Sequence, residues 1–358
     1  MSSSPVLVPV LRTVQVLGGA SGGAHVRSLA TGLAARGVRV TVCAPVEAEG
    51  EYDFTGAGAH FTPDAVSALR AACVEADVVH AHGVRAGLRA ALALRGRRIP
   101  MVVSWHGGGP GAGRLSLLLE RRVARAAAIV LGASSAQVDL ARRLGARDAR
   151  LAAVAVPAPV PQGPSAVLEP GKVRAELGVV ERPLLIAVGS LVARRGYSVL
   201  LDAARAWRTL DPLPLLVIAG EGPMRAELAR RIQLEGLPVR LLGRRRDAAR
   251  LLAVADVAVL ASRWEGRSPL AQEALRAGVP LVATAVGGLP ELVGEAGVLV
   301  PYGDAAALAA AVSDLLTDPA RRARLAEAGR AQARTWPSED DTVAQVLSVY
   351  DELVPRRR

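Results

Sequence analysis

"TVQVLGGASGGAHVRSLATGLAARGVRVTVCAP", residues 13–45, contains a complete strand–helix–strand pattern. Residues 13–17 form a short apolar run typical of a buried strand, and residues 38–45 form a second one. Between them, apolar side chains recur with the spacing of one helix face before the chain reaches a helix-terminating glycine. Two strands joined by a helix through short connections predict a parallel, doubly wound α/β sheet.

The same alternation extends in both directions along the chain. Strand-like runs follow at 76–83 and 100–109, and five prolines between residues 157 and 170 then indicate a linker. Beyond the linker, strands alternate with helices again, with strand-like runs at 183–191, 214–222, 239–243, 255–262, 279–286 and 297–300. The sequence therefore predicts two Rossmann-like domains, 1–166 and 167–337, followed by an amphipathic helix over 338–354 that Ser338 caps. In two such sheets the expected ligand site is the cleft that they face.

Composition and apolar patterning predict a globular protein without a membrane span. The chain has 358 residues, of which 51% are apolar, and it contains no run of about twenty uncharged apolar residues. Residues 1–19 have no basic stretch before their apolar run, as a secretory signal would, and we interpret them as a first buried strand. A cytoplasmic location is therefore expected. Cys43 and Cys73 have no metal-binding spacing, and we expect buried free thiols.

The positive charge of +11 is concentrated in the first half of the chain. Residues 1–166 hold 18 arginines against 10 acidic residues, and Lys172 is the only lysine of the chain. One interpretation is contact with an anionic partner, either a membrane at its inner face or a phosphorylated acceptor. The other is a solvated surface shaped by GC-rich codons. No nucleic-acid partner is expected, because there is no recognition motif and aromatic residues are few.

The first half offers two candidate sites at strand ends. Residues 18–23, "GGASGG", lead from a strand into a helix, where bare amides suit an anion; the spacing is not that of a dinucleotide fingerprint, so a tight turn explains it equally well. His106 follows another strand and is expected to face a ligand, although a bond to nearby backbone is the alternative. His80 and His82 alternate on a strand without partner spacing, and no metal site is predicted.

The second half offers a candidate diphosphate site. Arg194 and Arg195 follow a strand and precede Gly196, where guanidinium groups suit a diphosphate, although solvated loop arginines explain them as well. Glu221 lies between glycines at the next strand end.

The stretch "SRWEGRSPLAQEALRAG", residues 262–278, carries the most specific pattern. Ser268 is suited to cap a helix and Pro269 to begin it, so the amides there can bind phosphate. Glu265 lies in the loop, and Glu273 lies two turns into the helix. Two carboxylates on either side of a phosphate site are what a sugar–diphosphate–nucleoside requires, whereas a helix salt bridge explains only one of them.

Taken together, these motifs resemble those of the retaining family 4 glycosyltransferases, which have the GT-B fold. The resemblance extends over nearly the whole chain. It rests on the order of "GGASGGAHVRSLATGLAARG", "DVVHAHG", "SWHGG", "VGSLVARRGY", "AGEGPMRAEL" and "ADVAVLASRWEG". The most specific part is the Glu-x7-Glu element with the flanking "ALRAGVPLVATAVGGLPELV".

The resemblance implies roles for individual residues. Glu265 would contact the donor sugar and Glu273 the donor ribose. Arg195 stands where the family usually has a lysine on the diphosphate, and His106 would face the transferred sugar. The phosphates would rest on the backbone amides of the 266–270 loop, which comprises Gly266, Arg267, Ser268, Pro269 and Leu270. Gly22, Gly23, Ser190, Arg194 and Glu221 would complete the donor site.

The resemblance also implies transfer without a metal ion or cofactor, and a final helix that packs back on the first domain. One position departs from the family pattern: Ser190 stands where an arginine commonly neutralises the leaving diphosphate. The sequence thus predicts a hexosyltransferase using a nucleotide sugar and an unidentified acceptor, lipid-linked or phosphorylated. The alternatives are a sugar-nucleotide epimerase and, because of Ser190, a sugar-nucleotide-binding protein without catalysis.

Overall fold

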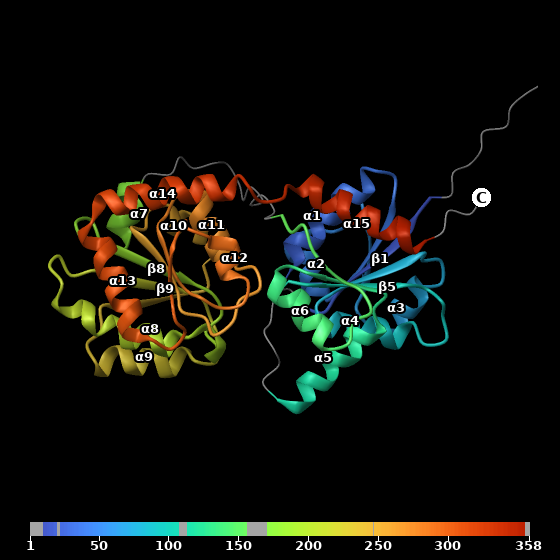
Figure 1. The fold of residues 1–358 in the computed structure, drawn as a ribbon, viewed down its shortest axis with the longest axis horizontal. Helices are drawn as coiled ribbons and strands as arrows, with labels where there is room; N and C mark the ends of the chain where they lie inside the picture. The colour runs from blue at the N-terminus through green and yellow to red at the C-terminus, as the bar shows by residue number, and fades with distance from the viewer. Residues whose placement is uncertain (1–9, 20–21, 107–112, 156–169, 246, 355–358) are drawn as a thin grey trace, which may run out of the picture. The chain divides into compact units, whose positions relative to one another are not determined.

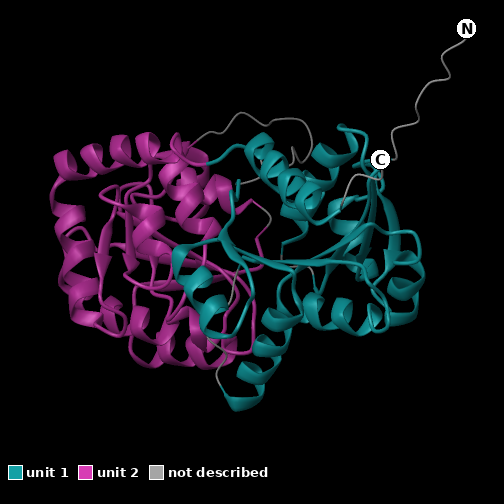
Figure 2. Cartoon of the chain, turned by 45° about the vertical axis from the view of Figure 1, so that its right-hand side comes forward, with its two compact units in different colours: residues 1–158, 337–358 teal, residues 159–336 magenta. Residues whose placement is uncertain are grey.

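The chain forms two units, each with its own parallel sheet (Figure 2). The computed structural model describes residues 10–19, 22–106, 113–155, 170–245 and 247–354. Unit 1 comprises residues 1–158 and 337–358, and unit 2 comprises residues 159–336. The boundary predicted after residue 166 lies in a stretch, 156–169, outside the described residues.

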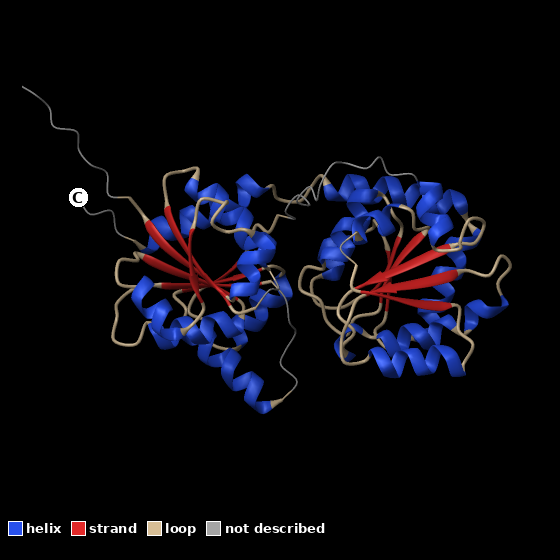
Figure 3. Cartoon of the chain, turned by 180° about the vertical axis from the view of Figure 1, so that it is seen from behind, coloured by secondary structure: helices blue, strands red, loops and turns tan. Residues whose placement is uncertain are grey.

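Unit 1 is built on a seven-stranded sheet with the order β3-β2-β1-β4-β5-β6-β7, and each neighbouring pair is parallel. Helices lie on both sides of this sheet (Figure 3), as expected for parallel strands, whose two faces must both be covered. The strands are β1 (Arg12–Leu17), β2 (Arg39–Ala44), β3 (His60–Pro63), β4 (Val78–His82), β5 (Met101–Trp105), β6 (Ile129–Gly132) and β7 (Ala149–Leu151). The helices are α1 (Gly23–Ala34), α2 (Val46–Tyr52), α3 (Val66–Ala72), α4 (Val84–Ala93), α5 (Arg114–Ala126), α6 (Ser135–Arg143) and α15 (Glu339–Leu353).

Unit 2 repeats this plan, with helices around a central sheet (Figure 1). Its six-stranded parallel sheet has the order β10-β9-β8-β11-β12-β13. Its strands are β8 (Leu184–Val188), β9 (Leu215–Ala219), β10 (Val239–Gly243), β11 (Val257–Leu260), β12 (Leu281–Thr284) and β13 (Val298–Val300). Its α-helices are α7 (Pro170–Glu176), α8 (Tyr197–Ala204), α9 (Arg225–Leu234), α10 (Ala248–Ala253), α11 (Pro269–Ala277), α12 (Leu289–Val293), α13 (Ala305–Thr317) and α14 (Pro319–Ala333). Two short 3-10 helices complete it, η1 (Ala193–Arg195) and η2 (Ala206–Thr209).

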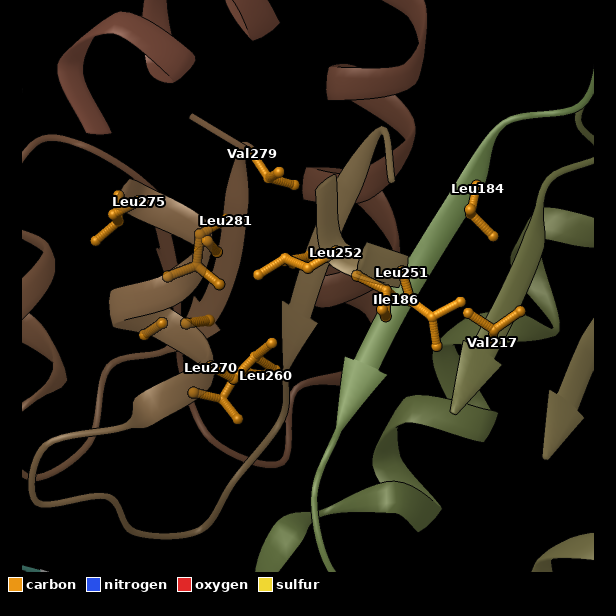
Figure 4. Packing of buried hydrophobic residues seen from close by; sticks show 14 of the residues in the cluster. Leu184, Ile186, Val217, Leu251, Leu252, Leu260, Leu270, Leu275, Val279 and Leu281 are labelled. Atoms are coloured by element: carbon orange, nitrogen blue, oxygen red, sulfur yellow. The ribbon is translucent and has the colours of Figure 1, made fainter. Parts of the chain in front are cut away.

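Strand β8 shows why continuous apolar runs form these sheets. Leu184 and Ile186 point to one face of the sheet and Leu185 and Ala187 to the other, and each pair is buried in a separate cluster. Figure 4 shows the first cluster, in which Ile186 lies near Leu251 of α10 and Val217 of β9. Full burial of such a side chain contributes about 1.5–3 kcal/mol, so both faces stabilise the strand.

Helix α15 belongs to unit 1 although it comes last in the chain. Ser338 caps it as the sequence predicts, accepting a hydrogen bond from the Asp341 amide at 3.1 Å. Its buried face includes Val343, Val346 and Tyr350, which join the apolar cluster of α1 and β2. The fully buried Tyr350 hydroxyl accepts a hydrogen bond of 2.9 Å from the Gln15 amide on β1.

Cys43 and Cys73 are buried and free, which confirms the sequence prediction. Burial raises the pKa of the Cys43 thiol to about 12, so it stays protonated at neutral pH. Within the described part of the chain, no helix is long and apolar enough to cross a membrane.

Each sheet has one point where the chain reverses the direction in which strands are added. In unit 1 this point lies between β1 and β4, and in unit 2 between β8 and β11. The loops that leave the carboxyl ends of two such strands diverge to opposite faces and leave room for a ligand. The candidate site residues of both units lie in or near the loops that leave these strands.

Candidate active site

The loops after β8 and β11 are joined closely at the reversal point of unit 2. The Arg263 amide donates to the Arg194 carbonyl at 2.8 Å. Gly196 has a φ of +69°, and a Cβ there would lie 1.8 Å from the Ala261 carbonyl oxygen. A glycine is therefore required for this approach, which fixes the start of α8 against the end of β11.

Arg195 and Glu265, two residues predicted to bind the donor, form an ion pair at this junction. The Arg195 Nη1 donates to Glu265 Oε1, and the two side chains are only 18% and 7% exposed. Ser262 also donates to Glu265 Oε1, at 2.7 Å. The buried Arg195 Nε has no hydrogen-bond partner in the described part of the chain, so the guanidinium retains a donor for a second anion.

The loop after β12 holds the backbone of Glu265 from the other side. The Gly288 amide donates to the Glu265 carbonyl at 2.9 Å. Gly287 has a φ of +56°, and a Cβ there would lie 2.0 Å from the same carbonyl oxygen. Thr284 donates to the Ser262 carbonyl at 2.6 Å. Sequence reasoning did not assign roles to Ser262, Thr284 or Gly287, because only the fold brings the β12 loop beside the β11 loop.

The helix N-terminus predicted from the 262–278 stretch is the start of α11. Buried Ser268 caps it, accepting from the Ala271 amide at 3.4 Å, and Pro269 takes the first position. The Gln272 amide is bonded to the Ser268 carbonyl. Among the described residues the amide of Leu270 has no such partner, so it and the helix dipole suit an anion.

Arg267 and Glu273 both have substantially buried charges near this helix. The Arg267 guanidinium lies 5.6 Å from the centre of the Trp336 ring, and its Nε donates to Gln272 Oε1 at 3.3 Å. Burial lowers the pKa of Arg267. Burial also raises the pKa of the Glu273 carboxyl, an effect that Arg276 opposes. A half-buried carboxylate of this kind suits hydroxyl groups, which can hydrogen-bond to it without adding charge.

Three of the other predicted donor residues of unit 2, Ser190, Arg194 and Glu221, lie at the surface, and Gly266 does not. Ser190 and Arg194 are exposed in the loop after β8. Gly266 is buried within the loop before α11. Glu221 is exposed after β9, where it forms an ion pair with Arg225 at 2.9 Å. The structure thus brings Arg195 together with Glu265, whereas Glu221 is occupied by a neighbour on α9.

The glycine loop of unit 1 ends in a turn that only glycine tolerates. Gly22 is exposed at the N-terminus of α1 with a φ of +93°. Gly23 is buried, and a Cβ there would lie 2.3 Å from the Tyr52 ring. Packing against Tyr52 is therefore enough to explain a glycine at position 23, with or without a ligand. Residues 20–21 of this loop lie outside the described residues.

His106 follows β5 directly and is part of a histidine cluster. Both of its ring nitrogens are buried without a hydrogen-bond partner among the described residues. The backbone that follows it, 107–112, lies outside those residues, so the alternative of a bond to nearby backbone stays a prediction. Its ring centre lies 4.3 Å from that of His25 and 5.8 Å from that of His82. Burial, reinforced by the charges of His25 and His80, lowers the pKa of His106 well below its usual value.

Sequence reasoning missed His25, which lies in the first turn of α1. Burial lowers the pKa of its ring to about 4, although the Glu339 carboxylate opposes this. His80 is saturated, because Nδ1 is bonded to the Tyr350 hydroxyl at 2.8 Å and Nε2 to Ser104 Oγ at 2.7 Å. The cluster that faces the strand ends is therefore His25, His82 and His106.

Comparison with family models and known proteins places the chain in a family. Residues 21–157 match the model described as "Glycosyl transferase 4-like domain", and residues 182–318 match "Glycosyl transferases group 1". A GDP-mannose-dependent α-(1-6)-phosphatidylinositol monomannoside mannosyltransferase of Mycolicibacterium smegmatis is 33% identical over 52% of this chain and 57% of its own length. A D-inositol 3-phosphate glycosyltransferase of Xylanimonas cellulosilytica is 31% identical over 78% of this chain and 73% of its own.

Solved structures agree on the fold. Anabaena HepE, in complex with UDP and glucose, superposes with a TM-score of 0.82 at 20% identity, covering 96% of this chain and all of that one. Sucrose-phosphate synthase from Thermosynechococcus elongatus gives 0.73 at 22% identity, covering 96% of this chain and 99% of its own. With one family model on each unit and a relative matched along about three quarters of both chains, the protein belongs to the family 4 glycosyltransferases of GT-B fold.

Proposed function

We propose that the protein transfers a sugar from a nucleotide-diphosphate sugar to a hydroxyl acceptor with retention of configuration. The observation that carries this proposal is the pairing of Arg195 with Glu265 at the reversal point of the unit 2 sheet, close in sequence to the N-terminus of α11. A cation, helix amides and a carboxylate at one strand edge suit a diphosphate joined to a sugar.

Each group has a distinct part in the proposed reaction. The Arg195 guanidinium binds the diphosphate and stabilises the charge that it gains as the glycosidic bond breaks. The amides of the 266–270 loop and the dipole of α11 bind phosphate oxygens. Glu265 accepts hydrogen bonds from the donor sugar, and Glu273 from the ribose. In unit 1 we assign neutral His106 to the transferred sugar, as a hydrogen-bonding partner.

Transfer is proposed to need no metal ion. Arg195 and the amides before α11 supply the positive potential that a divalent cation supplies in other phosphate-binding sites. The sugar acceptor is proposed to be phosphorylated or lipid-linked. The basic charge of residues 1–166 and the names of two relatives, which act on D-inositol 3-phosphate and on a phosphatidylinositol mannoside, support this choice.

The test is incubation with a panel of nucleotide sugars, with and without inositol phosphates and their lipids as acceptors, followed by mass spectrometry of donor and acceptor. We expect a new glycoside whose anomeric configuration is that of the donor. An epimerised donor without transfer, or donor binding without turnover, would replace the proposal by one of the two alternatives; neither finds support among the relatives.

Removal of the Glu273 carboxylate should weaken nucleotide binding. If this group bonds the ribose, Glu273→Ala is expected to cost roughly 1–3 kcal/mol in affinity for the nucleoside diphosphate, the loss of charge-assisted hydrogen bonds. Calorimetric titration with UDP and GDP measures it. The matched control is Glu227→Ala, which removes an exposed carboxylate on α9. Equal affinities for wild type and Glu273→Ala would refute the ribose assignment.

Helix α5 supports the further proposal that unit 1 contacts an anionic membrane. Its buried face holds Glu120, Val123 and Ala124. On the opposite side, Leu115 and Leu118 are 70% and 61% exposed. Arg121, Arg122 and Arg125 are exposed further along the same helix. An exposed helix with leucines and arginines is typical of one that lies in the interface of an anionic bilayer, and the N-terminal end of α5 extends beyond the rest of unit 1 (Figure 1).

Charge on the leucine face of α5 should abolish this contact. The double variant Leu115→Asp/Leu118→Asp is expected to lose binding to vesicles of anionic phospholipid, which wild type binds at low salt and releases as salt screens its arginines. Co-sedimentation with vesicles measures it. Leu234→Asp is the control, because Leu234 is 72% exposed at the end of α9. Unchanged binding of the double variant would assign the contact to another surface.

A further inference from the structure

Three histidines meet at the carboxyl edge of the unit 1 sheet. His25 lies in the first turn of α1, His82 ends β4, and His106 follows β5. Because β1, β4 and β5 are neighbours in the sheet, the segments that leave their carboxyl ends come together. One ring nitrogen of each histidine lies within 4.8 Å of the others. We propose that His25, His82 and His106 form a binding site for a divalent transition-metal ion of the Zn²⁺ class.

The distances between the ring nitrogens are close to those found around a bound metal ion. Zinc binds imidazole nitrogen at about 2.0–2.1 Å, so two nitrogens of a tetrahedral site lie about 3.3 Å apart. Ring rotations that bring each nitrogen inward by less than about 1 Å convert the observed cluster into such a site. His25 and His106 are only partly buried, so an ion can reach the cluster, and three ligands leave a fourth position open.

Hydrogen bonds fix the tautomer of His82. Its Nε2 is bonded to Gln15 Oε1 at 2.9 Å. The Gln15 amide nitrogen donates to Thr13 Oγ1 and to the Tyr350 hydroxyl, each at 2.9 Å, so the amide oxygen must face His82. His82 Nε2 therefore carries the proton, and Nδ1 presents a lone pair. In metal sites a ligating histidine is fixed in the same way through its other nitrogen.

The cluster lacks the bonds that would otherwise satisfy its nitrogens. His82 Nδ1 and both nitrogens of His106 are buried without a partner among the described residues. A buried polar atom left without a hydrogen bond is destabilising, so a ligand for these atoms stabilises the cluster.

The donor set selects the class of ion. Three imidazoles suit Zn²⁺, Co²⁺, Ni²⁺ or Cu²⁺, whereas Mg²⁺ and Ca²⁺ prefer oxygen. The two remaining histidines of the chain do not compete. Both nitrogens of His80 are already bonded, and His60 is exposed on edge strand β3. This inference does not depend on the proposed transferase activity, because binding is measured without donor or acceptor.

The experiment uses full-length protein without a histidine tag, titrated with Co²⁺ and followed by its visible absorption. We expect one tightly bound Co²⁺ per chain with the intense bands of a tetrahedral site, displaced by Zn²⁺. His25→Ala should weaken Co²⁺ binding at least about tenfold, and His60→Ala should bind as wild type. Zn²⁺ should raise the thermal unfolding midpoint of wild type and of His60→Ala equally, and that of His25→Ala by less at the same Zn²⁺ concentration.

Three results would overturn the inference. One is the absence of Co²⁺ and Zn²⁺ binding by the folded wild type. Another is a His25→Ala variant that is folded, by circular dichroism, and binds as tightly as wild type. The last is a loss in His60→Ala equal to that in His25→Ala, which would place the ion on the surface. None of these would bear on sugar transfer, which is measured separately.

Discussion

Arg195→Ala is expected to lower the rate of sugar transfer at least about a hundredfold, the loss seen when one preorganised charge stabiliser is removed. The leaving diphosphate becomes more negative as the glycosidic bond breaks, so a cation there stabilises the transition state more than the bound donor. Arg195 is mostly buried, where charge is poorly screened, and its guanidinium also pairs with Glu265. Initial rates of transfer or donor hydrolysis measure the effect.

Two further variants complete this test. Arg230→Ala removes an exposed arginine of α9 and should leave the rate unchanged. Ser190→Arg, at an exposed position after β8, should leave activity unchanged or raise it, because an arginine fits there without burial. If Arg195→Ala keeps the wild-type rate, the diphosphate is bound elsewhere. If wild type binds donor without turnover and Ser190→Arg gains activity, the chain is a binder that has lost catalysis.

Gly287→Ala is expected to reduce transfer about a hundredfold, although Gly287 contributes no side chain. A Cβ at this position would lie 2.0 Å from the Glu265 carbonyl oxygen, so the Glu265 loop must move. Displacement of a positioning group by about 1 Å can cost a hundredfold in rate. The left-handed backbone adds about 1–2 kcal/mol of destabilisation. Steady-state kinetics and thermal unfolding measure the two effects separately.

Gly236→Ala separates backbone strain from displacement of Glu265. Gly236 has almost the same φ, +57°, but a Cβ there meets nothing within 4 Å. It should therefore lose stability by a similar amount while it retains transfer. Wild-type kinetics in Gly287→Ala would mean that the β12 loop does not position Glu265 for the reaction.

The positions of the strands were the part of the fold that the sequence predicted best. The apolar run 183–191 predicts a strand at the position of β8 because buried parallel strands need apolar side chains on both faces. The helix at 262–278 was equally clear, since Ser268 and Pro269 are local signals that act within one turn. Strand order was not accessible, because adjacency of β1 with β4, or β8 with β11, depends on packing between distant segments.

The same limit applies to the site. Arg195 and Glu265 were each assigned to the donor by resemblance, but their ion pair joins residues 70 positions apart and emerges only from the fold. His25 carries no local signal, since a histidine in the first turn of a helix has many explanations. It becomes notable beside His82 and His106. The roles of Glu273, Gly22 and Gly23 stay predictions.

The return of α15 to unit 1 has a consequence for the order in which the protein folds during synthesis. Val343, Val349 and Tyr350 fill part of the unit 1 core, and Tyr350 bonds both Gln15 and His80. The ribosome delivers these residues after all of unit 2. The domain that is translated first is therefore completed last, and until then its nascent chain exposes the apolar side chains of α1 that α15 later covers, which a chaperone can bind.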